Sequence, residues 1–282
     1  MMSHCHSLMG MNAIHCRQLQ FSLIATLLLL CPAATLPPQL TAAEKTTVGT
    51  LLDGTPQATP FYVCDSGQPG PVVMVTGGVH GDEPAGAAAA ERIRHWHVGK
   101  GKLIVVPMLN VRGLAAQQRT MPGLEATLAD LNRDFAHVNS KGESPRGRPA
   151  KEIWQFVLKQ QPDWLVDLHE ARTLHGTGDD SVGNALLVVP SPELTEAEPA
   201  LLKAVNATIA DRRYRFIVGR RPKDTTLARA AGEHMGIHAF IIETAKAGQT
   251  LQVRVAEHCA IVSTLLTHLG MEVRTEKLWT ER

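Results

Sequence analysis

Short apolar runs alternate with longer amphipathic segments along most of this chain. Continuous apolar runs of roughly four to eight residues predict strands that are buried on both faces of a sheet. Segments in which apolar positions recur every three or four residues predict helices. The predicted strands are 72–76, 102–109, 164–168, 185–189, 214–218 and 237–242, and the predicted helices are 85–97, 149–160, 193–212, 225–235 and 251–269.

This alternation of strands and helices predicts an α/β fold with a mostly parallel, mixed central sheet covered by helices on both faces. The chain has 282 residues, of which 44% are hydrophobic and 20% charged, so it can bury a full core. We therefore expect a single domain over residues 44–282. Residues 138–148 (VNSKGESPRGR) are polar with Gly and Pro, and this composition predicts a surface loop.

Residues 1–43 have the features of a signal peptide. Arg17 precedes the apolar run FSLIATLLLL at 21–30, which is too short to span a bilayer comfortably, and small residues follow up to Ala43. We therefore expect export to the periplasm or the extracellular space, with cleavage near Ala43. Because the segment before the apolar run is only weakly basic, an uncleaved N-terminal membrane anchor is the alternative.

Charge and aromatic content argue against two classes of partner. A formal net charge of +1 provides no attraction to nucleic acid or to an anionic membrane surface. Aromatic residues make up 4% of the chain, so stacking platforms for bases are not expected. Two cysteines, Cys64 and Cys259, lie outside the leader. They could form a disulfide in an oxidising compartment or be two buried free thiols, and the sequence does not decide between these alternatives.

The segment MVTGGVHGDEP places His80 and Glu83 three residues apart, just after the predicted strand 72–76. This spacing suits the first two ligands of a divalent metal ion. The glycines around His80 favour a sharp turn, with the backbone close to a bound ligand. Asp82 competes with Glu83 for the role of ligand, although neighbouring side chains usually point apart.

A catalytic zinc ion needs a third protein ligand and keeps one position open for water. His169 is the best candidate, because it directly follows the apolar strand 164–168. In open α/β sheets, sites form at the carboxyl ends of the strands. The sequence therefore predicts one zinc ion held by two imidazoles and one carboxylate.

Two further segments carry candidate chemistry. Glu243 follows the apolar strand 237–242, and a carboxylate there has either a partner or a catalytic role. We favour a role as general base, and the alternative is an N-cap or loop carboxylate paired with Lys246. In LADLNRDF, Asn132 and Arg133 suit recognition of a substrate carboxylate. A solvated surface turn is the alternative for that segment.

Four motifs in order, GGVHGDE, DLNRDF, DLHE and IIET, resemble the zinc carboxypeptidase superfamily, and within it the succinylglutamate desuccinylase and aspartoacylase branch. The aromatic residue after DLNR and Asp favours this branch over digestive-type carboxypeptidases. The resemblance implies a zinc carboxypeptidase-like fold. It also implies that His80, Glu83 and His169 bind one zinc ion and that Glu243 is the general base.

The same resemblance assigns four more residues and an activity. Asn132 and Arg133 would bind a substrate carboxylate, Arg119 would polarise the scissile carbonyl, and Asp130 would orient His80. The implied reaction is zinc-dependent hydrolysis of an amide bond, as in an N-acyl amino acid deacylase or a carboxypeptidase. The implied partner is a small molecule or short peptide with a free carboxylate.

Two other functions remain open. A non-catalytic zinc- or peptide-binding protein on the same scaffold and a metallo-esterase would both use the same ligands. The resemblance also has a limit, because aspartoacylase-like enzymes carry a further C-terminal β-rich domain. Only a helix and a short tail follow Glu243 here, which predicts a more open cleft.

Overall fold

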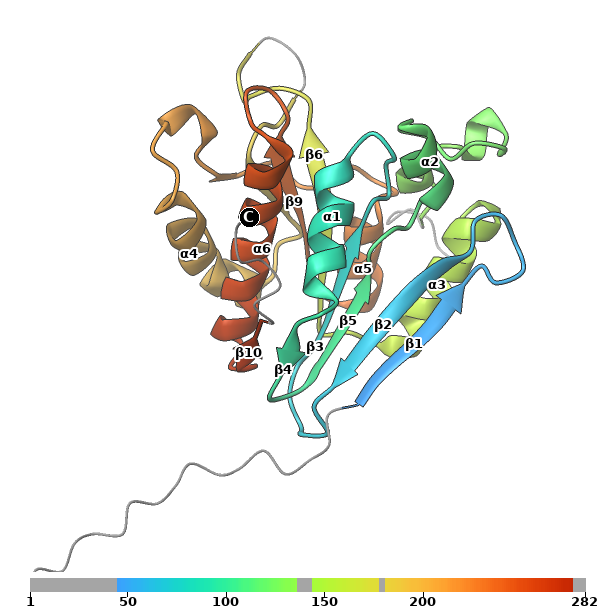
Figure 1. Ribbon diagram of the computed structural model, residues 1–282, viewed down its shortest axis with the longest axis horizontal. Helices are drawn as coiled ribbons and strands as arrows, with labels where there is room; N and C mark the ends of the chain where they lie inside the picture. Colours follow the sequence, from blue (N-terminus) through green and yellow to red (C-terminus); the bar gives the residue numbers. More distant parts are fainter. Residues whose placement is uncertain (1–44, 136–143, 178–180, 276–282) are drawn as a thin grey trace, which may run out of the picture. The chain divides into compact units, whose positions relative to one another are not determined.

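The structure, a computed structural model, describes residues 45–135, 144–177 and 181–275 (Figure 1). The predicted signal peptide at 1–43 lies outside the described residues, as does most of the predicted loop at 138–148. None of the described helices is both long and apolar enough to cross a membrane.

An eight-stranded mixed sheet forms the centre of the described chain, with the strand order β1-β2-β5-β3-β6-β9-β7-β8. The neighbours β5, β3, β6 and β9 run parallel, whereas β2 is antiparallel to β5 and β7 is antiparallel to β9. The predicted mixed sheet is therefore confirmed. The strands are β1 Lys45–Leu51, β2 Thr59–Asp65, β3 Val72–Gly77, β5 Lys102–Val106, β6 Trp164–Ala171, β7 Ala185–Val188, β8 Ile217–Val218 and β9 His238–Ala245, and a separate ribbon joins β4 His97–Val98 to β10 Val273–Arg274.

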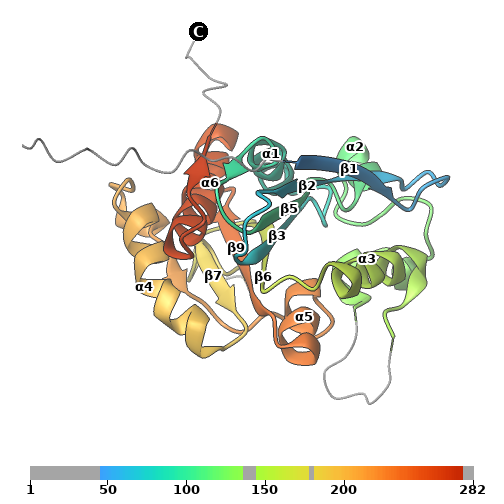
Figure 2. The same ribbon diagram turned by 90° about the horizontal axis from the view of Figure 1, so that it is seen from below.

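Helices cover both faces of this sheet, as predicted. Helices α1, α4 and α6 lie on one face, and α3 and α5 lie on the other (Figure 2). The α-helices are α1 Pro84–Ile93, α2 Val111–Ala116, α3 Gly147–Gln160, α4 Pro192–Asn206, α5 Leu227–Met235 and α6 Leu251–His268, and short 3-10 helices span Ala126–Leu128, Leu131–Arg133 and Arg212–Tyr214.

The central strands contribute side chains to two separate cores. In β3, Val73 and Val75 pack under α1 and α6, whereas Met74 packs on the opposite face with α3 and α5. This alternation follows from the period of two along a strand. It explains why the strand reads as one continuous apolar run: both of its faces are buried.

Several predicted boundaries were wrong, and β1 and β2 were not predicted. In β1, most residues are exposed, so no apolar run marks that strand. The predicted helix 85–97 ends at Ile93, because residues 97 and 98 pair with β10 instead. The predicted strand 237–242 continues through Ala245, since its polar residues are still paired with β6.

The structure contains no disulfide between Cys64 and Cys259, the two cysteines of the described chain. Cys64 in β2 is buried in the core under α1 and α6, and Cys259 on α6 packs against the same core. The sequence left open a disulfide or two buried thiols, and the structure has two thiols, of which Cys64 is buried and Cys259 is partly buried.

Helix α6 buries a carboxylate that makes stability depend on pH. Glu257 is 4% exposed, and its Oε1 accepts a hydrogen bond from Gln249 Nε2 at 2.6 Å. Its Oε2 is buried and has no hydrogen-bond partner among the described residues. Burial raises the pKa of Glu257 from its ordinary value near 4.5 to about 7, so the folded protein favours the protonated form.

We predict that Glu257→Gln stabilises the protein at pH 8 by about 1 to 2 kcal/mol and by much less at pH 5. The raised pKa means that the folded protein loses stability as pH rises from about 4.5 to about 7, and the neutral amide removes this loss. Urea unfolding of both proteins at the two pH values measures the difference. An equal effect at pH 5 and pH 8 would contradict the prediction.

Candidate active site

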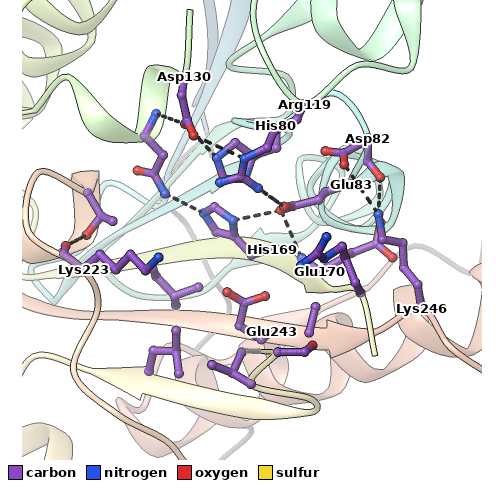
Figure 3. Close-up of a pocket in the computed structure, with 18 of the residues that line it drawn as sticks. His80, Asp82, Glu83, Arg119, Asp130, His169, Glu170, Lys223, Glu243 and Lys246 are labelled. Atoms are coloured by element: carbon purple, nitrogen blue, oxygen red, sulfur yellow. Dashed lines mark hydrogen bonds and ion pairs between the residues drawn. The ribbon is translucent and has the colours of Figure 1, made fainter. Parts of the chain in front are cut away.

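Three neighbouring parallel strands, β3, β6 and β9, bring the candidate catalytic residues to one edge of the sheet (Figure 3). His80 lies in the loop after β3, and Glu83 directly precedes α1. His169 and Glu243 lie near the carboxyl ends of β6 and β9, and the two residues are paired in register. This is the sheet edge at which α/β proteins build their sites.

The structure brings the three predicted metal ligands together. The Glu83 carboxylate lies between the two imidazoles: Oε1 is 2.8 Å from His80 Nδ1, and Oε2 is 2.9 Å from His169 Nδ1. One nitrogen or oxygen atom from each residue lies within 4.8 Å of the others, and all three side chains are buried. Two imidazole nitrogens and one carboxylate are a donor set that suits a divalent transition-metal ion such as zinc.

A backbone turn places His80 at this position. Gly78 has a φ of +64°, in the left-handed region that glycine adopts without steric cost. A Cβ atom at Gly78 would lie 2.8 Å from Leu114 Cδ1. The glycine therefore lets the chain turn sharply out of β3 toward the candidate metal ligands.

The second nitrogen of each imidazole faces another carboxylate. His80 Nε2 lies 3.1 Å from Asp130 Oδ1, and His169 Nε2 lies 2.9 Å from Asp167 Oδ2. The other oxygen of Asp167 accepts a hydrogen bond from Thr76 Oγ1 at 2.7 Å. Such carboxylates orient metal-binding imidazoles and fix their tautomer, leaving Nδ1 of each ring for a metal.

Asp167 was not among the predicted site residues. It is two positions before His169 on β6, and residues two apart in a strand share a face. The DLHE motif therefore carried a signal that could have identified this residue.

Electrostatics at the cluster favour a bound cation. Burial opposes ionisation of Glu83, but the neighbouring His80 and His169 hold the pKa of its carboxyl well below the usual range. Burial would also lower the pKa of His169, yet Asp167 and Glu83 raise that pKa well above its ordinary value. The carboxylates thus stabilise positive charge in a place from which water is largely excluded.

Glu243 faces the same cavity. Its carboxylate points toward His169 (Figure 3) and makes no hydrogen bond or ion pair within the described part of the chain. Burial raises its pKa to about 7, although the nearby His169 acts in the opposite direction. A carboxylate with this pKa can accept and release a proton near neutral pH.

The described structure contains neither of two arrangements that the sequence left open, a Glu243–Lys246 pair and Asp82 as the metal-binding carboxylate. Lys246 does not pair with Glu243, because its ammonium donates to the backbone oxygen of Asp82 at 2.7 Å. The Asp82 carboxylate faces the same ammonium at 3.9 Å and lies outside the group of possible metal ligands. Glu83, and not Asp82, is therefore the carboxylate positioned with the two histidines.

Arg119 lies at the edge of the metal cluster. Its Nη1 donates to Glu83 Oε1 and its Nε donates to Asp130 Oδ2, both at 3.2 Å. The side chain is 41% exposed, so the guanidinium remains accessible from the cavity that it lines. This placement makes Arg119 available to a group bound next to a metal ion.

Asn132 and Arg133 line the same cavity. Asn132 is buried, and its Oδ1 accepts a hydrogen bond from the backbone N–H of Leu227 at 3.0 Å. Its Nδ2 lies 3.2 Å from His169 Nε2. Arg133 donates from Nη1 to the backbone oxygen of Asn132 at 2.6 Å and is half-buried. Arg133 is thus the more accessible of these two side chains.

The cavity has a volume of about 470 Å³, and basic side chains line one of its walls. Arg220, Arg221 and Lys223 line this wall from the segment before α5. The Lys223 ammonium points into the cavity (Figure 3) and forms no ion pair in the described ranges. Sequence reasoning missed these residues, although the cluster RRPK was visible as a run of positive charge.

A comparison with known protein families identifies the family of this chain. Residues 69–269 match the model of the succinylglutamate desuccinylase/aspartoacylase catalytic domain. The chain belongs to this family. The match covers all four sequence motifs, so the resemblance stated from those motifs is confirmed.

One curated protein is similar to this chain in sequence, and two solved structures are similar to it in fold. The chain is 35% identical over 123 residues to the N-alpha-acetyl-L-2,4-diaminobutyric acid deacetylase of Halomonas elongata, a stretch that covers 41% of this chain and 33% of that enzyme. The fold matches the product-bound cell shape determinant protein Csd4 of Helicobacter pylori with a TM-score of 0.61 and 20% identity, covering 83% of this chain and 57% of Csd4. A succinylglutamate desuccinylase/aspartoacylase structure from Rhodobacter sphaeroides matches with a TM-score of 0.55 and 21% identity, covering 81% of this chain and 66% of that one.

Proposed function

We propose that this protein is a zinc-dependent hydrolase that cleaves an amide bond in a small substrate bearing a carboxylate. The observation that carries the proposal is the convergence of His80, Glu83 and His169 with the carboxylate of Glu243, which faces them and has no partner among the described residues. A metal-binding cluster alone would suit a structural site. A carboxylate with a raised pKa that lines the same cavity suits catalysis.

The donor set fits zinc, and His80, Glu83 and His169 would hold it. Bound zinc supplies a Lewis acid that polarises a carbonyl and makes a water molecule acidic near neutral pH. Glu243 removes a proton from the attacking water and later delivers it to the nitrogen of the leaving amine. Arg119 stabilises the negative charge that develops on the carbonyl oxygen. The products are one carboxylic acid and one amine.

Positive charge in the cavity supports a carboxylate-bearing substrate. Arg133 and Lys223 line the cavity, and a guanidinium or an ammonium there can pair with a carboxylate. The relative from Halomonas is named a deacetylase, and Csd4 is described as a D,L-carboxypeptidase. These names support both an N-acyl amino acid and a short peptide as substrate. A metallo-esterase would use the same residues, so hydrolysis of matched amides and esters separates the two activities.

We predict that the protein binds one zinc ion and that His169→Ala weakens this binding by at least about a hundredfold, because one of three ligands is lost. Competition with a chromophoric chelator measures the affinity. His268→Ala, which changes an exposed histidine at the end of α6, is the matched control and should bind zinc like the unaltered protein. Equal affinity of the two variants would exclude the proposed site.

Glu243→Gln is expected to lower kcat by about a hundredfold or more, since the amide cannot transfer the proton. Zinc affinity should remain close to that of the unaltered protein, because Glu243 is not among the proposed ligands. Turnover of acetyl-aspartate, succinyl-glutamate, blocked dipeptides and murein peptides measures the effect. Glu196→Gln, an exposed change on α4, is the control. Loss of zinc in Glu243→Gln would argue against a division between ligands and base.

Lys223→Gln is expected to raise KM for an N-acylated acidic amino acid by about tenfold, because a charged partner of the substrate is lost. The effect should be smaller for the corresponding neutral amide substrate. Arg213→Gln removes an exposed charge that pairs with Asp211, and this control should behave like the unaltered protein. A KM that does not change for either substrate would remove Lys223 from the substrate-binding site.

A further inference from the structure

Glu83 directly precedes α1 but does not cap this helix. An N-cap side chain normally accepts a hydrogen bond from a backbone N–H of the first turn. Glu83 makes no such bond, because its two oxygens face the imidazoles of His80 and His169. Pro84 occupies the first helical position, where no N–H needs a partner. The first free N–H of α1 belongs to Ala85.

Glu170, on strand β6, provides the acceptor that Glu83 does not. Its Oε2 accepts a hydrogen bond from Ala85 N–H at 2.8 Å. Its own backbone N–H donates to Glu83 Oε2 at 3.1 Å. Glu170 is 4% exposed and directly follows His169 on β6. One residue thus connects the start of α1 to the strand that carries the third proposed ligand.

Helix α6 supplies the counter-charge for this buried carboxylate. Arg254 Nε lies 2.9 Å from Glu170 Oε1, and Arg254 is 8% exposed. One turn further along, His258 Nε2 lies 3.2 Å from Thr244 Oγ1. Glu170 and Thr244 are paired in register on β6 and β9. Helix α6 therefore contacts the residues that immediately follow His169 and Glu243.

We propose that Glu170 and Arg254 are positioning residues: Glu170 caps α1 in place of Glu83, and Arg254 balances its charge, so that the Glu83 carboxylate remains directed at the metal. This inference rests on the proposed zinc site. It assigns a purpose to a buried ion pair that takes no part in the proposed reaction. A buried ion pair is weak support for stability alone, because desolvation offsets much of the attraction.

Two double variants separate the cap from the charge. Glu170→Gln with Arg254→Met keeps an oxygen that can accept the Ala85 N–H and leaves no unpaired charge. Glu170→Ala with Arg254→Met also leaves no unpaired charge but removes the acceptor. Zinc affinity is measured by chelator competition, and urea unfolding of the metal-free proteins measures stability.

The single variant Glu170→Ala should weaken zinc binding by about ten- to a hundredfold, the range found when residues that orient metal ligands are lost. The Gln/Met variant should bind zinc nearly as well as the unaltered protein, whereas the Ala/Met variant should remain weak. Asn206→Ala removes a pair of hydrogen bonds to the backbone of Phe216, away from the site, and should lower stability without changing zinc affinity.

Equal zinc affinity of the two double variants would overturn the inference, as would an Asn206→Ala protein that loses as much affinity as Glu170→Ala. An unaltered protein that binds no zinc would overturn both this inference and the proposed function. Zinc binding without turnover of any substrate would overturn only the proposed reaction.

Discussion

The rest of the site depends on the contacts of the Glu83 carboxylate with the imidazoles of His80 and His169. Its two oxygens face one nitrogen of His80 and one of His169, so the loop between β3 and α1 meets strand β6 at a single group. This contact requires that strands β3 and β6 are neighbours and that α1 begins directly after Glu83. The parallel centre of the sheet and the packing of α1 are therefore requirements of the site as well as of the core.

Charged side chains surround this contact. Asp130 and Asp167 hold the outer nitrogens of the imidazoles, and the cavity beyond them is bordered by Arg119 and by the cationic wall at residues 220–223. Carboxylates thus adjoin the candidate metal ligands, and cationic side chains line the same cavity. This combination suits a cavity that holds a metal ion beside an anionic group.

The sequence predicted those parts of the structure that are marked by an apolar run or a short motif. Continuous apolar runs identified the central strands, and the motifs around His80, His169 and Glu243 identified residues that the structure brings together. The strand β1 was missed because its side chains are mostly exposed and carry no apolar pattern. Polar ends of β6 and β9 were also missed, since periodicity cannot show that a polar residue is still paired within a sheet.

Partners that are distant in sequence could not be predicted in this way. The Glu170 carboxylate bonds to the backbone N–H of Ala85, 85 positions earlier, and pairs with Arg254 on the last long helix. A buried Arg and Glu on otherwise apolar elements indicate only that each needs some partner. Which partner each one finds depends on the packing of α1 against α6, and that packing is a property of the assembled fold.

The pairing of β3 with β6 also has a consequence for when a metal ion could bind. His80 and Glu83 are three positions apart, but His169 is 86 positions from Glu83, so an unfolded chain holds only two of the three proposed ligands near each other. Contacts of such long sequence separation form late and slowly compared with local ones. A metal ion bound as proposed would therefore enter after the parallel sheet has formed, and it would stabilise the folded state relative to the unfolded chain.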